Sequence, residues 1–222
     1  MTCPATLLVI AKAPVAGFAK TRLSPPLTPR EAADLAAAAL LDTLEAVLAA
    51  EVEHRVVAFT GDPAAAERGA EVRALLARFE VLPQRGRTFG ERLANAHADA
   101  ARAGFPVLQI GMDTPQLSAA ELTAAATELA GTGEAVLGPA TDGGWWALGL
   151  PTPQPARALA AVPMSTARTG LLTRDALRRC GIPVRSLATH SDVDDFDDAL
   201  RVAAFAGGRF AAAVHRLTPV SR

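Results

Sequence analysis

The sequence predicts an α/β fold with a largely parallel sheet and helices on both of its faces. Short apolar runs rich in branched residues alternate with longer stretches of helical character, which is the pattern of strands joined by crossover helices. Two of the helical stretches open with Ser or Thr followed three residues later by Glu, a reciprocal capping arrangement. No change of composition marks a linker, so we expect residues 1–222 to form one domain.

The first element is a strand over residues 6–11, whose continuous apolar character indicates burial on both faces. A loop rich in Gly and Pro follows it. Thr28 then supplies a helix N-cap, with Pro29 at the first helical position and Glu31 at the third. A long helix rich in Ala and Leu should therefore run to about Ala50.

The same alternation continues through the middle of the chain. A second capping box at Ser118 and Glu121 predicts another helix start. The expected elements are a strand at 55–60, a helix at 63–78, a strand near Val81, a helix at 89–103, a strand at 107–111, the capped helix and a strand at 135–137.

The regular alternation of strands and helices ends after Asp142. Residues 145–150 indicate a strand, a connection rich in Pro follows at 151–155, and helices are expected at 169–179 and 194–204. Ligands bind such sheets beyond the carboxyl ends of the strands, so the residues that follow strands are the first place to seek a site.

Charge and composition exclude several classes of partner. The formal net charge is −1, from 22 basic and 23 acidic residues, so no overall charge favours nucleic acid or a membrane surface. No run approaches the about 20 apolar residues that cross a bilayer, and the start of the chain lacks the pattern of a secretory signal. Cys3 and Cys180 show no metal-ligand spacing, which favours reduced thiols. We expect a soluble, cytoplasmic protein, with a homodimer as an open possibility.

The loop after the first strand carries three cations and a flexible glycine. Lys and Arg side chains suit phosphate oxygens, and Gly permits close approach of the backbone. The loop has neither a Walker A ending nor a Rossmann glycine fingerprint, and a solvated basic loop is the alternative. We expect the Lys20 side chain to be solvated when no ligand is bound. The candidate phosphate-binding residues are Lys12, Gly17, Lys20, Thr21 and Arg22.

Two aspartates follow strands that should end at the same edge of the sheet. Asp113 comes after the strand at 107–111, and Asp142 comes after the strand at 135–137. If the two strands are neighbours, the two carboxylates can share one Mg²⁺ ion, whose remaining ligands are water and substrate phosphates. The alternative is that each aspartate only initiates a turn, which is a common use of Asp before Thr-Pro or Gly. We assign both residues as catalytic and metal-binding.

Three further groups are weaker candidates. Asp194 lies in an acidic run at a helix start, where it is either a third metal ligand or part of a helix cap. Gly90 and Arg92 stand at another helix start and can assist phosphates, although surface arginines usually face water. The residues after Asp142 can border an acceptor, although paired tryptophans more often pack in a core. These acceptor candidates are Gly143, Gly144, Trp145 and Trp146.

Four motifs in order resemble the bacterial domain-of-unknown-function family 2064, which is described as glycosyltransferases of GT-A-like fold. They are Lys-x-Pro-x-x-Gly-x-x-Lys-Thr-Arg-Leu at 12–23, Gly-x-Asp-x-Pro at 111–115, Gly-Pro-x-x-Asp-Gly-Gly at 138–144 and Asp-Val-Asp at 192–194. Residues 20–44 are also similar to the opening of 2-phospholactate guanylyltransferases. Both groups are similar in plan to molybdenum-cofactor guanylyltransferases.

The resemblance implies a nucleotide-diphospho-sugar transferase fold, a three-layer Rossmannoid sandwich, with Mg²⁺ or Mn²⁺ at a nucleotide site. It leaves two enzyme activities open. The preferred hypothesis is transfer of a glycosyl group from a nucleoside-diphosphate sugar to a small-molecule acceptor. The alternative is nucleotidyl transfer from a nucleoside triphosphate with release of pyrophosphate, and a nucleotide-binding module without catalysis comes third. Trp145 and Trp146 replace the tyrosines usual in the family, so any contact through a hydroxyl is lost.

Overall fold

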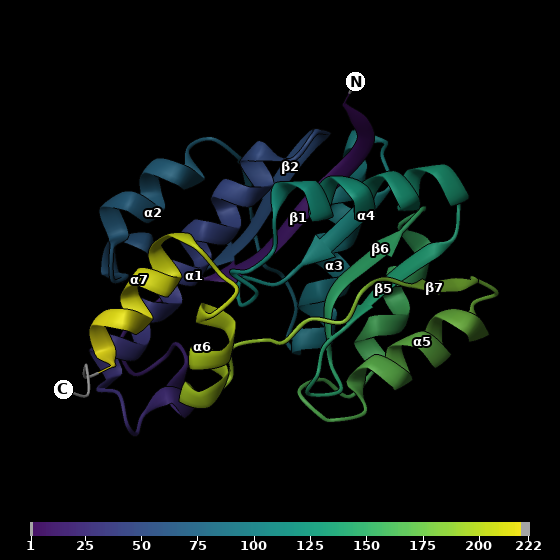
Figure 1. Ribbon diagram of the computed structural model, residues 1–222. Helices are drawn as coiled ribbons and strands as arrows, with labels where there is room; N and C mark the ends of the chain where they lie inside the picture. Colours follow the sequence, from purple (N-terminus) through teal and green to yellow (C-terminus); the bar gives the residue numbers. More distant parts are fainter. Residues whose placement is uncertain (1, 219–222) are drawn as a thin grey trace.

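The computed structural model describes residues 2–218, in which seven strands form one mixed sheet (Figure 1). Their order across the sheet is β3-β2-β1-β4-β6-β5-β7. The strands β1 to β5 and β7 run in one direction, and β6 pairs antiparallel with both of its neighbours. The strands are β1 (Cys3–Lys12), β2 (Val52–Thr60), β3 (Glu80–Pro83), β4 (Val107–Ile110), β5 (Ala135–Pro139), β6 (Trp145–Leu150) and β7 (Val184–Ser186).

The helices cover both faces of this sheet, and none of those in residues 2–218 is long and apolar enough to cross a membrane. The α-helices are α1 (Pro29–Ala49), α2 (Gly69–Leu76), α3 (Phe89–Ala100), α4 (Ala119–Thr132), α5 (Thr169–Arg179), α6 (Phe196–Ala203) and α7 (Gly208–Leu217). The 3₁₀ helices are η1 (Thr21–Leu23), η2 (Pro63–Ala65), η3 (Ala101–Ala103) and η4 (Gln154–Ala161).

The alternating side chains of the strands divide the core into two layers. Leu7 and Val9 of β1 pack in the cluster that includes α1, α2 and α4. Leu8 and Ile10 point to the opposite face, where they pack in the cluster that includes α3, η4 and α5. Because β1 is central and apolar on both faces, it explains the uninterrupted apolar run in the sequence.

A third apolar cluster attaches the C-terminal helices to the outer side of α1 (Figure 1). Leu35 of α1 packs there with Val202 of α6 and Phe210 of α7. Leu23 of η1 belongs to the same cluster, so the basic loop after β1 is anchored at its far end. This arrangement brings the segment before α6 to the edge of the sheet at which β1 ends.

The expected capping boxes are confirmed. Thr28 accepts a hydrogen bond from the backbone N–H of Glu31, whose carboxylate accepts one from the N–H of Thr28. Ser118 and Glu121 form the same pair at the start of α4. These reciprocal bonds satisfy backbone donors that the first helical turn leaves free.

The sheet is mostly parallel, as expected. The strand β6 is antiparallel because only residues 140–144 separate it from β5, too few for a parallel crossover.

Two details of the fold differ from the sequence-based expectation. The helix expected at 63–78 is split into η2 and α2, because Arg68 adopts a left-handed conformation (φ 52°) that a continuous helix cannot contain. The elements η1, η4, β7 and α7 had not been expected.

Candidate functional site

Asp113 and Asp142 lie at the same edge of the sheet, as expected, but their strands are not adjacent. Asp113 follows β4 and Asp142 follows β5, and both strands point their carboxyl ends to this edge. The strand β6 lies between them. The two aspartates are therefore brought together across an intervening antiparallel strand, which corrects the expectation of neighbouring strand ends.

Asp192 connects these two aspartates electrostatically. Burial, and then the charges of Asp113 and Asp142, raise the pKa of the Asp192 carboxyl to about 7. The charge of Lys20 and a hydrogen bond of 3.3 Å from the Thr114 hydroxyl act in the opposite direction. The three carboxylates thus form one cluster with more negative charge than its surroundings neutralise.

Lys20 lies inside this cluster and is not solvated, which corrects the expectation for this side chain. Its Nζ atom is 2.9 Å from Oδ2 of Asp113 and 3.9 Å from Oδ1 of Asp194, and it donates a hydrogen bond to the carbonyl oxygen of Val193. Only 11% of the side chain is exposed. The first loop therefore contacts the carboxylates directly, even without a nucleotide.

The acidic run before α6 serves two purposes. Asp194 faces the site, where its Oδ2 atom accepts a hydrogen bond of 3.2 Å from Nη1 of Arg22. Asp195 and Asp198 form a capping box at the start of α6. The capping interpretation is thus confirmed for Asp195 and Asp198, and a metal-binding role for Asp194 stays a prediction. A cavity of about 440 Å³ opens beside it, lined by Arg22, Thr141, Asp142, Asp192, Asp194, Asp195, Asp198 and Arg201.

The other candidates in the first loop lie at the same edge and are more accessible. Lys12 ends β1, and its exposed Nζ atom donates a hydrogen bond of 3.2 Å to the carbonyl oxygen of Phe18. Gly17 has φ 79° and open space where a Cβ atom would stand. Thr21 begins η1 and is exposed. These residues border the carboxylate cluster without being buried in it.

The Asp-Gly-Gly segment is a tight turn that packs against the start of α5. Oδ1 of Asp142 accepts a hydrogen bond of 2.7 Å from the N–H of Gly144. Gly143 has φ 87°, and a Cβ atom on it would lie 2.0 Å from the carbonyl oxygen of Ala167. The N–H of Gly170 bonds the carbonyl oxygen of Gly143 at 2.8 Å. The glycines therefore permit close packing that orients Asp142, and acceptor contact by Gly143 and Gly144 stays a prediction.

Trp146 is buried, in contrast to the acceptor-facing position expected for it, whereas Trp145 is half-buried and an acceptor role for it stays a prediction. Trp146 is only 3% exposed, and its ring meets His190 edge-on at a centroid distance of 5.0 Å. Its indole N–H donates to the carbonyl oxygen of Ala188 at 2.9 Å. The indole N–H of Trp145 donates to the hydroxyl of Thr173 at 3.2 Å. Both rings hold the C-terminal half of the sheet together.

Gly90 has a packing role at the start of α3. A Cβ atom on it would lie 2.3 Å from the carbonyl oxygen of Leu159, so glycine permits the close contact between α3 and η4. Arg92 lies half-buried in the first turn of the same helix, after the carboxyl end of β3. The nearby Arg85 is paired with Asp99 at 2.7 Å. A phosphate-binding role for Arg92 stays a prediction.

The chemistry of the cluster fits a divalent metal completed by substrate. Its donors are hard carboxylate oxygens, and burial, followed by the charges of Asp113 and Asp142, raises the pKa of Asp192, so that a cation bound there would favour its charged form. Among residues 2–218, no three acidic, His or Cys side chains are already placed around one point as a closed metal site. Mg²⁺ commonly takes one or two carboxylates and fills its other positions with water and phosphate oxygens, so this open arrangement suits it.

Residues 43–166 match the family described as an uncharacterized protein conserved in bacteria, domain of unknown function 2064. The chain belongs to this family. Over 139 residues, this family member is 38% identical to a protein named phosphoenolpyruvate guanylyltransferase from Streptosporangium roseum. The match covers 63% of the chain and 60% of that relative, which is less than two thirds of the relative's length.

Solved structures establish the fold of this member of family 2064. A protein from Desulfovibrio desulfuricans, provisionally described as a nucleotide-diphospho-sugar transferase, superposes with a TM-score of 0.83 at 24% identity. The superposition covers 97% of the chain and 95% of that protein. A Mycobacterium tuberculosis protein in complex with manganese superposes with a TM-score of 0.54 at 22% identity, covering 89% and 97%. The expected family and the nucleotide-diphospho-sugar transferase fold are therefore confirmed.

Proposed function

We propose that this protein is a divalent-metal-dependent nucleotidyltransferase that joins a nucleoside monophosphate unit to a small acceptor and releases pyrophosphate. The observation that carries the proposal is the cluster of Asp113, Asp142 and Asp192 with the cations of the first loop beside it. Carboxylates that hold a metal next to a cationic loop suit the turnover of a phosphate ester. The guanylyltransferase name of the Streptosporangium roseum relative favours nucleotidyl transfer, with guanosine triphosphate as the first donor to test.

In this proposal Asp113 and Asp142 hold the metal, and Asp194 is a third ligand. When bound, the ion supplies neutralisation of the charge that develops on the leaving pyrophosphate. Lys12, Lys20 and Arg22 supply the positive charge for the remaining phosphate oxygens, because all three belong to the loop that ends at the cluster. We take Mg²⁺ as the ion, and the manganese in one structural neighbour supports a divalent cation at a site of this fold.

Glycosyl transfer from a nucleoside-diphosphate sugar is the second candidate. The Desulfovibrio desulfuricans neighbour, which covers nearly the whole chain, is provisionally described as a nucleotide-diphospho-sugar transferase. The two activities share the fold, a metal and a basic loop. They differ in the bond that breaks, because sugar transfer releases a nucleoside diphosphate and nucleotidyl transfer releases pyrophosphate.

The leaving group is therefore the decisive measurement. The protein is incubated with Mg²⁺, guanosine triphosphate and phosphoenolpyruvate, and in parallel with pooled nucleotide donors and a small-molecule cell extract as the acceptor source. We expect metal-dependent release of pyrophosphate that Asp113→Ala abolishes and that the control Asp175→Ala, on α5, leaves intact. Release of a nucleoside diphosphate from a nucleotide sugar, with no pyrophosphate from any triphosphate, would replace the proposal with the second candidate.

A further inference from the structure

The ammonium group of Lys20 has the contacts of a bound cation. It lies 2.9 Å from the Asp113 carboxylate and 3.9 Å from that of Asp194, and it bonds the carbonyl oxygen of Val193. Three oxygen atoms from two separate segments thus surround one positive charge. With 11% of the side chain exposed, solvent screens these contacts less than those of a surface ion pair.

The backbone at Lys20 indicates that these contacts hold the loop in place. Lys20 has φ 50° and ψ 43°, a left-handed conformation that is strained for a residue with a side chain. Such a conformation persists when surrounding contacts determine it. The ion pair with Asp113 and the hydrogen bond to Val193 are the contacts that can offset this cost.

A metal at the same carboxylates competes with this ammonium. Asp113 and Asp194 are both among the proposed metal ligands, and Lys20 contacts one carboxylate oxygen of each. A divalent ion and an ammonium group beside the same two carboxylates repel each other strongly at partly buried positions. Both cations therefore cannot hold their best positions at the same time.

We propose that Lys20 is an internal counter-ion of the carboxylate cluster, which a divalent metal displaces and thereby releases toward the nucleotide phosphates. The inference rests on the proposed metal-dependent function and adds an order of events to it. Metal binding breaks the contacts to Asp113 and Val193 and frees the left-handed residue to move. The loop that binds phosphate is in this way coupled to the occupancy of the metal site.

The sequence offers a direct probe, because Lys12 and Lys20 are its only two lysines. Labelling the lysines with ¹³C yields two side-chain signals, which the variant Lys12→Met assigns. We expect titration with Mg²⁺ alone to move the Lys20 signal toward that of a solvated lysine, while the exposed Lys12 signal stays in place. A Lys20 signal that does not move when Mg²⁺ is saturating would overturn the proposal. This measurement needs no change at Lys20 itself.

Metal affinity supplies the second readout, with Mn²⁺ alone as the probe and calorimetry as the measurement. Lys20→Met removes the competing cation and should bind Mn²⁺ about fivefold more tightly than the parent, the size expected for one lost ion pair. The same variant should bind the complex of Mn²⁺ and guanosine triphosphate more weakly, because the phosphates lose a cation. The matched control Lys12→Met should leave the affinity for Mn²⁺ alone unchanged.

Lys20→Met should change the affinities for Mn²⁺ alone and for its nucleotide complex in opposite directions, which separates this inference from the proposed function. If Lys20→Met binds Mn²⁺ no more tightly than the parent while the parent still releases pyrophosphate, the counter-ion role is wrong and the nucleotidyltransferase stands. If neither protein binds Mn²⁺, with or without nucleotide, both proposals fail. A variant that binds Mn²⁺ where the parent does not supports the counter-ion role in its strongest form.

Discussion

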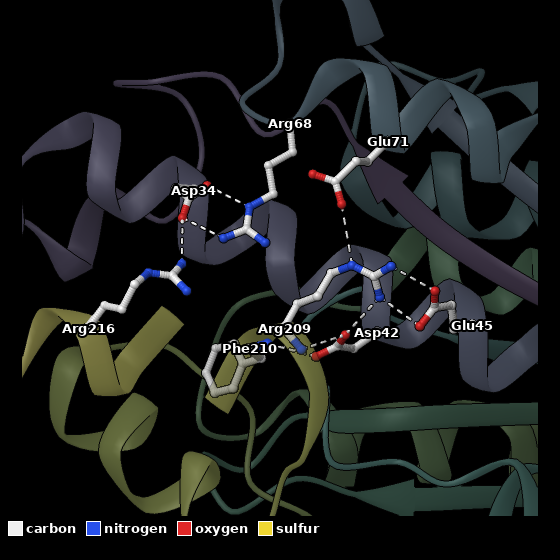
Figure 2. Close-up of polar contacts among 8 residues, drawn as sticks. All are labelled: Asp34, Asp42, Glu45, Arg68, Glu71, Arg209, Phe210 and Arg216. Atoms are coloured by element: carbon white, nitrogen blue, oxygen red, sulfur yellow. Dashed lines mark hydrogen bonds and ion pairs between the residues drawn. The ribbon is translucent and has the colours of Figure 1, made fainter. Parts of the chain in front are cut away.

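Two clusters of charged side chains in this molecule use the same residue types with opposite electrostatic results. In the cluster around α1, Arg209 bonds the carboxylate of Glu45 through both terminal nitrogens, at 2.7 and 2.8 Å, and also contacts Asp42 and Glu71 (Figure 2). The Arg209 guanidinium holds the pKa of Glu45 below its usual range. Here the carboxylates are satisfied by cations.

At the cluster of Asp113, Asp142 and Asp192, the carboxylates are not fully paired with cations. Asp192 is surrounded by Asp113 and Asp142, and burial together with these charges raises its pKa. Lys20 and Arg22 offset only part of the repulsion. A raised pKa means that the fold disfavours the charged form of the carboxylate. A bound cation would stabilise that charged form. The two clusters thus differ in whether charged neighbours lower or raise the pKa of a carboxylate.

The largest expected effect is at Asp113, where the comparison predicts loss of turnover without loss of stability. Asp113→Ala should reduce metal-dependent pyrophosphate release by at least about a hundredfold, because it removes a group that positions the stabilising charge. The melting temperature should change little, since loss of the ion pair with Lys20 and relief of the repulsion on Asp192 act in opposite directions. Calorimetric melting beside the activity assay measures both, and a marked fall in melting temperature would place Asp113 among the structural carboxylates.

Asp42 should behave in the opposite way. Its carboxylate accepts hydrogen bonds from the backbone N–H groups of Arg209 at 3.1 Å and Phe210 at 2.8 Å, so it caps α7 from another helix (Figure 2). Asp42→Ala should lower the free energy of unfolding by about 1–3 kcal/mol and leave turnover intact. Urea titration measures the first quantity. Asp42→Asn, which keeps one acceptor oxygen, should recover part of the loss.

A buried histidine extends the comparison to a group that the fold keeps uncharged. Burial lowers the pKa of His97 from 6.5 to about 4, and Gln109 offsets little of this, since its amide lies outside hydrogen-bonding geometry with the ring. The unfolded chain therefore binds a proton that the folded chain does not, and stability falls as the pH decreases from about 6.5 toward about 4. The slope from this group should reach at most about 1.4 kcal/mol per pH unit.

The measurement is urea unfolding across that range of pH. His97→Leu replaces the titrating ring with an apolar side chain and should remove this contribution to the slope. An unchanged slope in the variant would show that other groups cause the acid sensitivity.

The smallest expected effect is at Lys12, the exposed cation of the basic loop. Lys12→Met should weaken nucleotide binding several-fold at low salt, because the contact with phosphate is screened by solvent. The melting temperature should not change, since the Nζ atom bonds only the carbonyl oxygen of Phe18 among residues 2–218. Lys12→Arg should retain most of the affinity, and equal affinity in Lys12→Met and the parent would indicate a solvated loop without a ligand role.

Local patterns in the sequence were sufficient to predict most of the helices and strands. The capping boxes at Thr28 and Ser118 marked helix starts that the structure confirms, and the helix expected at 169–179 has the same bounds as α5. The strand pattern at 145–150 indicates a strand but not its direction, which the short connection after β5 determines. The left-handed Arg68 that splits the second helix is held by a tertiary contact, the pairing with Asp34 at 2.6 Å, which no local pattern shows.

The candidate site was only partly predictable, for a similar reason. Motif spacing indicated Asp113 and Asp142, and topology brought them to one edge. Asp192 was not among the predicted site residues, although it begins the Asp-Val-Asp motif at 192–194, because its burial near the other two aspartates is a tertiary property. The contact of Lys20 with Asp113 was missed because the solvation of a loop lysine was judged without its distant partners. The proposed roles in catalysis and metal binding, and the single domain, stay predictions.

The contact between Lys20 and Val193 joins positions 173 residues apart, so it closes a loop that spans most of the polypeptide. A ribosome releases the N-terminal strands long before the segment at 190–194 has been made, and distant contacts of this kind form late because their loop closure is costly in entropy. The nascent chain can therefore assemble β1, β2 and β4 without any working site. If the proposed site is the catalytic one, chains interrupted before residue 190 should be inactive, so that activity would report completed synthesis.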